Sequence, residues 1–401
     1  MSEVSKSKLW IVTELFYPDQ TSTAYILSKI ANRLTEKYDV NVITTDSLYQ
    51  ENISNSVKYF KLDESISVIR VKSKRLNKNS LIQRFVRLFA QSSSLYREFK
   101  NRVTKNDKVI IVTNPAPLII KCANLKKRRD FHLNILVHDV FPENTIPAGI
   151  IPSKKSFLFK ILAKRYNKAY ANADKLIVLG RDMKDIVEQK IVGSKHEPEI
   201  VIIENWGDVD NIKPKERHQN EYITIQYAGN IGRVQGLESF INLIEKSVNK
   251  KLVFDLWGDG AMTDNLKSIV SEKGMNDRVN FHGSYSREKQ NDILNSADIA
   301  LVTLAEGMYG LGVPSKTYNI LAAGKPVLYI GDLNSEIALM VNEESVGYCF
   351  SQNDKEGIIN FLNELQLGLL PKLEEMGKRA RRLAEIRYSE DAILDKFLNV
   401  V

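Results

Sequence analysis

The amino-acid sequence predicts an α/β protein made of two Rossmann-like, doubly wound domains that face each other across a cleft. Its 401 residues are too many for one ordinary hydrophobic core, so two or three domains are expected. Short apolar runs alternate with longer amphipathic segments, which is the pattern of buried parallel strands joined by crossover helices. The same alternation begins again after residue 220, which indicates a second domain of similar size.

Ten apolar runs are interpreted as strands, five in each half of the chain. The first five lie at residues 9–16, 40–45, 108–114, 133–140 and 175–180, and the others at 223–229, 252–260, 279–285, 299–304 and 326–331. Between the two sets, residues 205–221 are polar and contain a proline, which is typical of a linker. Ligands of such sheets bind beyond the carboxyl ends of the strands, so a ligand is expected in the interdomain cleft.

The composition is that of a globular protein, with 43% apolar and 26% charged residues. The net charge of +8 is divided unevenly, because residues 1–200 carry +15 and residues 201–401 carry −7. A basic first half predicts an anionic partner for the first domain. Cys122 and Cys349 match no metal-ligand spacing and are expected to be buried residues in a reducing compartment. No signal peptide and no transmembrane run is predicted, hence a cytoplasmic protein.

The basic residues are concentrated in three segments of the first half. Residues 70–105 contain 11 Lys or Arg against one acid, and residues 126–129 and 153–168 continue the pattern. Within the first segment an apolar side has helical spacing, formed by Leu81, Ile82, Phe85, Val86, Leu88 and Phe89. Basic amphipathic helices of this type bind anionic lipid, which predicts peripheral attachment to the inner face of the cell membrane. The alternative is an apolar side buried in the domain core beneath solvated lysines.

After the first expected strand, Thr21, Ser22 and Thr23 precede an amphipathic helix. Hydroxyl residues at this position commonly cap the helix. The functional alternative is that their hydroxyls and the backbone N–H groups bind a phosphate of the ligand in the cleft.

The corresponding turn of the second domain contains Gly229, Asn230, Gly232 and Arg233. It lacks the GxGxxG spacing of dinucleotide-binding domains. A glycine-containing turn with one arginine suits a diphosphate, because the guanidinium group offers two parallel donors to phosphate oxygens. The alternative is a surface arginine beside a structural turn.

The segment from residue 312 to residue 328 combines flexible backbone with polar side chains on a short helix. Gly312 allows a close approach of the backbone to a ligand. Ser315 is the expected N-cap, and Gly324 is expected just past the end of the helix. Lys316 at the helix start is electrostatically unfavourable unless an anion is bound there. Asn319 lies on the same helix face as Ser315 and could bind a sugar hydroxyl group.

His138 and Asp139 follow an expected strand of the first domain, where residues of the cleft should lie. A histidine there could position a hydroxyl group near neutral pH, although a lone histidine at a strand end is more often structural. The other histidines show no metal-ligand spacing, so no metal site is predicted.

Together, five motifs resemble the retaining glycosyltransferases of the GT-B fold, in the family 4 group. The resemblance covers nearly the whole chain, and within the family it is greatest to bacterial enzymes that build capsule, O-antigen or exopolysaccharide units. The motifs occur in the family's order and spacing, and they are IIENWGDVDNIKP, YAGNIGRVQGLE, LWGDGAMTDNLK, VNFHGSYSREKQNDILNSADIALVTL and VPSKTYNILAAGKPVL.

The resemblance implies a nucleotide-diphospho-sugar donor held mainly by the C-terminal domain. Arg233 and Lys316 then contact the diphosphate, together with the backbone of residues 312–315, and His138 helps to place the reacting sugar. No metal and no separate cofactor is implied. The other residues implied to line the donor site are Asn230, Gly232, Gly258, Asp259, Gly260, His282, Gly283, Ser284, Tyr285, Val313 and Ser315.

The sequence departs from the family pattern at several of these positions. The family usually has two glutamates eight positions apart, where this chain has Leu311 and Asn319. Glu306, in the preceding loop, is a candidate substitute. The lysine that usually follows the arginine is missing near Val234, and residues 21–23 replace a glycine pair.

The resemblance also implies a division into domains and a class of acceptor. Residues 1–205 form the acceptor-side and membrane-facing domain, residues 206–385 bind the donor, and residues 386–401 return to the first domain as a helix. The acceptor is a glycan carried on a polyprenyl lipid. The alternatives are a sugar epimerase, a phosphorylase, a catalytically impaired member and, less favoured, a nucleic-acid-binding protein, for which the basic segments lack a recognised module.

Overall fold

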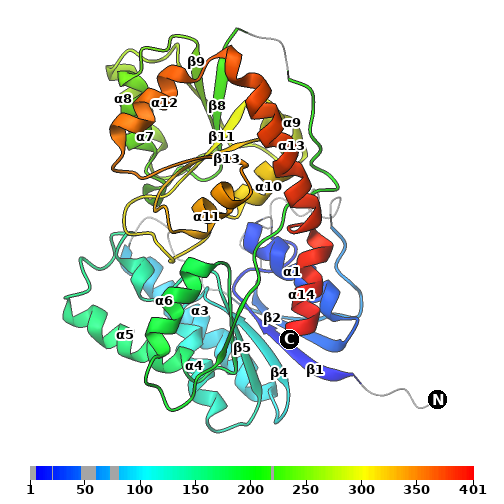
Figure 1. Cartoon of the computed structure of the whole chain (residues 1–401). Helices are drawn as coiled ribbons and strands as arrows, with labels where there is room; N and C mark the ends of the chain where they lie inside the picture. Colours follow the sequence, from blue (N-terminus) through cyan, green and yellow to red (C-terminus); the bar gives the residue numbers. More distant parts are fainter. Residues whose placement is uncertain (1–5, 20, 47–59, 73–80, 218–220) are drawn as a thin grey trace.

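The structure is a computed structural model that describes residues 6–19, 21–46, 60–72, 81–217 and 221–401, without the side chains of 81–86. It contains two separate parallel sheets, each with helices packed on it, so the predicted pair of Rossmann-like domains is confirmed (Figure 1). None of the described helices combines the length and apolar content needed to cross a bilayer.

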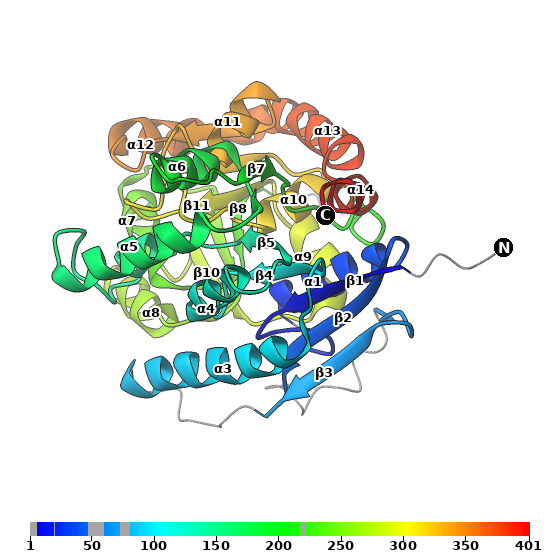
Figure 2. The ribbon, with the colours of Figure 1, turned by 90° about the horizontal axis from the view of Figure 1, so that it is seen from below.

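The N-terminal sheet has seven parallel strands in the order β3-β2-β1-β4-β5-β6-β7. Its strands are β1 (Ser7–Val12), β2 (Tyr38–Thr45), β3 (Ser67–Val71), β4 (Lys108–Val112), β5 (His132–Val137), β6 (Lys175–Val178) and β7 (Glu199–Ile202). Its helices are α1 (Ser22–Leu34), α3 (Leu81–Arg102), α4 (Pro117–Lys126), α5 (Phe157–Tyr170) and α6 (Arg181–Ile191). In the view from below, α3 lies on the opposite side of the molecule from α6 (Figure 2). The central strands are therefore buried on both faces, which explains their continuous apolar runs.

The C-terminal sheet has six parallel strands in the order β10-β9-β8-β11-β12-β13. They are β8 (Ile223–Ala228), β9 (Leu252–Trp257), β10 (Val279–Gly283), β11 (Ile299–Thr303), β12 (Val327–Ile330) and β13 (Gly347–Phe350). The helices are α7 (Leu237–Lys246), α8 (Thr263–Glu272), α9 (Gln290–Asn295), α10 (Lys316–Ala322), α11 (Glu336–Glu343), α12 (Lys355–Glu364), α13 (Leu370–Ile386) and α14 (Glu390–Val400). The strand order changes direction between β8 and β11, which is where doubly wound sheets bind ligands.

Two segments join the domains. The chain passes from β7 to β8 through residues 203–222, and the expected boundary near residue 205 falls within this segment. At the other end, α13 runs from the upper domain toward the lower one, where α14 lies beside α1 (Figure 1). An ion pair of 2.8 Å between Lys29 of α1 and Glu390 of α14 supports this contact.

A polar clasp also holds the domains together at the start of α6. The side chain of Glu336, at the start of α11, is 3% exposed. It accepts hydrogen bonds from the Arg181 backbone N–H (2.8 Å), Nε (2.9 Å) and Nη2 (3.1 Å), while Arg181 Nη1 donates to Glu343 (2.7 Å). Gly180 is needed at this contact, because a Cβ atom there would lie 2.6 Å from the Cβ of Glu336. We call Arg181, Glu336 and Glu343 the interdomain clasp.

The basic helix α3 packs part of its apolar side against the core of the N-terminal domain. On α3, Leu95 and Phe99 are buried in the core, whereas Phe89 is 41% exposed. The expected apolar positions 81, 82, 85 and 86 have side chains outside the described part of the chain. The two cysteines are free, Cys122 buried and Cys349 half-buried, as the sequence predicted for small core residues.

Candidate functional site

The loops after β8 and β9 pack so closely that glycine is required between them. A Cβ atom at Gly258, whose φ is +128°, would lie only 1.9 Å from the carbonyl oxygen of Gly229. Backbone hydrogen bonds from Gly229 to Trp257 (2.8 Å) and from Ile231 to Asp259 (3.0 Å) join the loops. At Gly260 an added Cβ atom would likewise be 2.4 Å from the oxygen of Ile231. These glycines therefore shape the edge of the site.

Lys316 is the most unusual group at this edge. Its Nζ atom is buried and has no hydrogen-bond partner among the described residues, although the residue as a whole is half-buried. The Nζ lies 3.3 Å from the centre of the Tyr227 ring, and a Cβ atom at Gly229 would be 3.5 Å from it. Tyr227 is fixed by a 2.6 Å hydrogen bond from its hydroxyl group to the carbonyl of Asn230. Burial lowers the pKa of Lys316 well below its usual value.

A buried cation without a counter-ion is costly, and a bound anion would remove that cost. The ring face of Tyr227 offsets part of it through a cation–π contact. Lys316 therefore marks the position at which the site can accept negative charge.

Arg233 follows the same turn and is exposed, with no hydrogen bond or ion pair to the described residues. Its Nη1 atom is 3.9 Å from the position that a Cβ atom would take at Gly149 of the other domain. Asn230 is also exposed, and Gly232 begins the short 3-10 helix Arg233–Gln235. The structure thus places the guanidinium group of Arg233, unpaired among the described residues, close to Gly149 of the N-terminal domain and four residues beyond Gly229.

His138 and Asp139 lie at the end of β5, facing the second domain. Their backbone N–H groups both donate to Thr113 Oγ1, at 3.1 Å each. His138 Nε2 is buried without a partner among the described residues, and burial lowers the pKa of His138 to about 4, so the ring is neutral at pH 7. Burial raises the pKa of Asp139 to about 6, against the lowering effect of a hydrogen bond from Asn144 Nδ2.

Residues 138–140 contact the loop that leads into α10. The Val140 N–H donates to the Leu311 carbonyl at 3.1 Å. At Gly312, a Cβ atom would lie 3.5 Å from Asp139 Oδ1 and 3.7 Å from the His138 carbonyl. The structure therefore brings the backbone of His138 in one domain beside Gly312 of the other, and the role of His138 toward a sugar stays a prediction.

One expectation for α10 needs correction. Ser315 stands at the N-cap position, but its backbone is helical (φ −61°, ψ −25°) and its side chain makes no capping hydrogen bond. Asn319 Oδ1 accepts a hydrogen bond of 2.9 Å from the Asp208 N–H in the interdomain segment. That bond uses one of the two lone pairs of the oxygen, so the contact of Asn319 with a sugar hydroxyl stays a prediction. Gly324 lies just past the helix with φ +64°, as predicted.

An aromatic group occupies the ends of β9 and β10. The His282 ring stacks on Trp257 with centres 4.2 Å apart and planes inclined by 10°, and Tyr285 meets Trp257 edge-on at 6.3 Å. His282 Nε2 lies 3.2 Å from Asp255 Oδ1, which fixes the ring. Trp257 Nε1 is buried without a partner among the described residues. Between His282 and Tyr285, Gly283 has a left-handed backbone conformation (φ +75°) and Ser284 is exposed.

Asp259 and the residues after β1 have mainly structural contacts. Asp259 Oδ1 accepts bonds of 2.7 Å from Thr263 Oγ1 and from the Gly260 N–H, and these bonds lower the pKa of Asp259. Thr21 caps α1 by accepting from the Ala24 N–H at 3.2 Å, which confirms the capping interpretation for this residue. Ser22 is exposed and Thr23 half-buried, and their contact with a phosphate stays a prediction.

Glu306 is exposed and lines a pocket formed by the loops after β11, β12 and β13. Lys316 does not line this pocket. Val313 is half-buried between the contact at Gly312 and α10. Among the described residues, no group of three or more His, Cys, Asp or Glu side chains is arranged to hold a metal ion.

The structure adds two candidate site residues that the sequence analysis did not select, namely Tyr227 and Trp257. Tyr227 and Trp257 lie near the ends of β8 and β9, and the sequence analysis read them only as members of apolar runs, which do not distinguish single aromatic side chains. Asp139 was visible next to His138, but its burial against the other domain follows only from the folded arrangement.

Comparison with known proteins is consistent with this geometry. Residues 208–383 match the family model described as glycosyl transferases group 1. The chain is 31% identical to the probable glycosyltransferase WbjE of Pseudomonas aeruginosa, over 98% of this chain and 96% of that protein. It is 24% identical to the putative colanic acid biosynthesis glycosyl transferase WcaI of Escherichia coli K12, over 57% of each.

Solved structures share the fold at low sequence identity. Sucrose-phosphate synthase from Thermosynechococcus elongatus superposes with a TM-score of 0.78 at 13% identity, over 98% of both chains. Anabaena HepE in complex with UDP superposes with a TM-score of 0.69, also at 13% identity and 98% coverage of both chains. These matches agree with the GT-B arrangement of the two sheets.

Proposed function

This chain belongs to the group 1 glycosyl transferases, and from that premise we propose which reaction it performs. It transfers a sugar from a nucleotide-diphospho-sugar donor, with retention of configuration, to a lipid-linked glycan acceptor during the synthesis of a bacterial surface polysaccharide. The name of WcaI refers to colanic acid biosynthesis, which supports a surface polysaccharide as the product class. The observation that carries the proposal is the buried, unpaired Lys316 ammonium beside Gly229.

We propose that the donor diphosphate binds at the carboxyl end of β8. Loss of the nucleoside diphosphate builds negative charge on its terminal phosphate, and Lys316 and Arg233 supply positive charge where that develops. The backbone of residues 312–315 completes the anion site. Because Lys316 has no carboxylate partner among the described residues, a bound diphosphate would be the counter-ion that favours its protonated form against the effect of burial on its pKa.

We propose that the nucleoside binds against the aromatic side chains at the ends of β9 and β10. The stacked rings of Trp257 and His282, with Tyr285 at their edge, offer apolar contact to a flat base. HepE has been solved in complex with UDP and with UDP-glucose, so uridine nucleotides are the first to test.

The transfer itself is assigned to groups that touch the sugar and the phosphate. The acceptor hydroxyl attacks on the face from which the phosphate leaves, and a departing phosphate oxygen takes the hydroxyl proton. His138, neutral at pH 7, positions the reacting sugar through its unpartnered Nε2. The proposal requires neither a covalent enzyme nucleophile nor a metal ion.

A donor screen tests this function. We expect one nucleoside diphosphate, and its sugar conjugate, to raise the melting temperature by binding to the folded protein, with about 2.7 kcal/mol of stabilisation at 100 times Kd. The same ligand should stabilise Lys316→Ala much less. Incubation with a lipid-linked glycan should release the nucleoside diphosphate and give a product whose anomeric configuration, read by NMR, equals that of the donor.

Outcomes of this screen also separate the alternatives. An epimerase would convert the donor without an acceptor, and a phosphorylase would require inorganic phosphate. A catalytically impaired member would bind the donor without turnover. If no nucleotide changes the melting temperature, the result contradicts the proposed donor site.

Attachment to the inner membrane face is proposed for the region before and at the start of α5. Ile150, Phe157 and Leu158 are 61%, 80% and 54% exposed, and Lys154 and Lys155 between them are exposed as well. Figure 1 shows α5 at the outer edge of the lower domain. Apolar side chains flanked by lysines suit insertion between anionic headgroups, where a lipid-linked acceptor lies.

Replacing Phe157 and Leu158 together by serine is expected to weaken binding to anionic vesicles by roughly tenfold or more, because two large apolar side chains no longer leave water. Co-sedimentation with phosphatidylglycerol vesicles measures this. Val248→Ser is the matched control, since Val248 is 75% exposed on the other domain and should bind like the unmodified protein. Equal sedimentation of both variants would contradict the attachment site.

A further inference from the structure

A second pocket lies on the C-terminal domain and shares no lining residue with the site around Lys316. It has a volume of about 310 Å³ and is formed by the loops that follow β11, β12 and β13. These loops stand at the carboxyl ends of parallel strands, the edge at which such sheets bind ligands. Its size is at the lower end of the range of about 300–1,000 Å³ for small-molecule sites.

The lining has a composition suited to a neutral, hydroxyl-rich ligand. Carboxylates, amides and hydroxyl groups line it, and its described lining residues include no Lys, Arg or His. An anionic ligand such as a diphosphate would therefore meet negative charge. Carboxylates accept strong hydrogen bonds from sugar hydroxyls, amides both donate and accept, and Met308 and Leu333 offer apolar contact to the C–H face of a sugar ring.

The walls of the pocket are already held in place. Ser335 Oγ donates to the Tyr329 hydroxyl at 2.7 Å, and Asp332 Oδ1 accepts from the Asn334 N–H at 2.9 Å. The Tyr309 hydroxyl donates at 3.1 Å to Asp185 of α6, in the other domain. Few side chains would have to be ordered on binding, which lowers the cost of holding a ligand.

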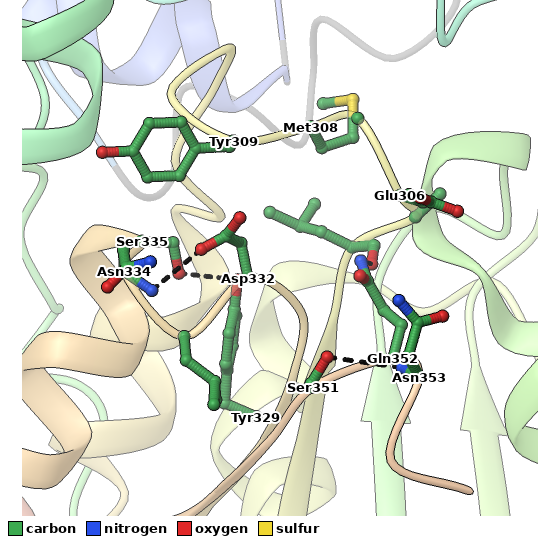
Figure 3. A pocket seen from close by; sticks show the side chains of 14 residues that line it. Glu306, Met308, Tyr309, Tyr329, Asp332, Asn334, Ser335, Ser351, Gln352 and Asn353 are labelled. Carbon is green, nitrogen blue, oxygen red and sulfur yellow. Dashed lines mark hydrogen bonds between the residues drawn. The ribbon is translucent and has the colours of Figure 1, made fainter.

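Several polar groups remain available to a ligand. Glu306 has no hydrogen bond or ion pair among the described residues, and the side-chain amide of Asn353 has none either. Figure 3 shows Asp332 at the centre of the view, with Glu306, Gln352 and Asn353 on one side and Asn334 and Ser335 on the other. Acceptors and donors thus face the space from two sides, as a ring with several hydroxyl groups requires.

We infer that this pocket is a second carbohydrate subsite, which binds a neutral sugar unit of the glycan apart from the donor diphosphate. The inference rests on the proposed function, because a glycan must be one of the substrates. It assigns the C-terminal domain a part in holding the glycan as well as the nucleotide. The wall of the pocket continues through residues 308–311 into the loop at Gly312, so an occupant would lie next to the domain interface.

Saturation-transfer NMR with methyl glycosides of glucose, galactose, mannose and N-acetylglucosamine tests the subsite in the full chain. At least one glycoside should receive saturation, and its affinity should fall roughly tenfold in the double variant Asp332→Asn, Asn353→Ala, since hydrogen bonds to a charged group are lost. The control Glu356→Gln changes an exposed carboxylate of α12 outside the pocket and should bind normally. Lys316→Ala and saturating UDP should also leave the signal unchanged.

The outcomes distinguish this inference from the proposed function. Absence of saturation for every glycoside, or equal binding by the double variant and the unmodified protein, overturns the subsite. Loss of the signal in Lys316→Ala or on addition of UDP also overturns it, because the sugar would then occupy the donor site. If glycosides bind as expected but no nucleotide raises the melting temperature, the subsite stands and the donor assignment fails.

Discussion

Replacing Lys316 with alanine is expected to slow sugar transfer by roughly 100-fold or more at saturating donor, as for the loss of one preorganised charge-stabilising group. The ammonium group lies beside Gly229 without a partner and against the Tyr227 ring, so its interaction with a leaving diphosphate is not weakened by water or by a carboxylate. Arg233→Ala should cause a loss of similar size. Steady-state release of nucleoside diphosphate in the presence of acceptor measures both.

Two further variants separate charge from packing. Lys316→Met keeps most of the side-chain volume and should lose as much turnover as the alanine variant, because the charge is what matters. Lys325→Met is the matched control, since Lys325 is also buried and has a pKa lowered by burial, but its Nζ donates to the Asn295 carbonyl at 3.1 Å. It should lose stability rather than turnover. Near-normal rates in both Lys316→Ala and Arg233→Ala would contradict the assigned diphosphate site.

Removal of the guanidinium group from the interdomain clasp is expected to destabilise the protein by about 2 kcal/mol or more. In Arg181→Ala, the Glu336 carboxylate keeps only the backbone N–H at residue 181 and remains buried at 3% exposure, which leaves a largely uncompensated charge. Because Arg181 belongs to the N-terminal domain and Glu336 to the C-terminal one, the same change should loosen domain closure. Thermal unfolding gives the stability, and small-angle X-ray scattering gives the radius of gyration.

The neighbouring pair of Lys184 and Glu188 is a suitable control. Its atoms are 3.6 Å apart on the exposed side of α6, within one domain. Lys184→Ala should change stability by less than about 0.5 kcal/mol, as exposed ion pairs contribute little. A melting temperature and radius of gyration for Arg181→Ala that match those of Lys184→Ala would show that the clasp does not hold the domains.

Sequence patterns predicted ten of the thirteen strands, including the edge strand β10, but not the other three edge strands. β3, β7 and β13 were not selected, because their sequences SVIRV, EIVI and GYCF are short and only half-buried. Edge strands of this kind have one neighbour and one accessible side, so they lack the continuous apolar runs that identify central parallel strands. The order of strands within each sheet was likewise not available from periodicity.

The site was predicted unevenly for a related reason. Residues in glycine-containing turns, such as Gly229, Gly258 and Gly312, were found because close backbone approach restricts the residue type locally. The roles of Ser315 and Asn319 were predicted from their helix positions alone. In the folded chain, Ser315 makes no capping hydrogen bond, and the Asn319 side chain accepts a hydrogen bond from Asp208. Side-chain roles of that kind depend on neighbours that are distant in the chain.

Local patterning was therefore sufficient for two parallel α/β domains and for the turns where a phosphate could bind, since the spacing of apolar residues and glycines reflects short-range sterics and burial. The unpaired state of Lys316 and the pocket beside Asp332 emerge only when the loops of the C-terminal domain pack together. The pairing of Arg181 with Glu336 emerges only when the two domains meet. Each depends on which groups become desolvated together, and desolvation is a property of the assembled chain rather than of any one segment.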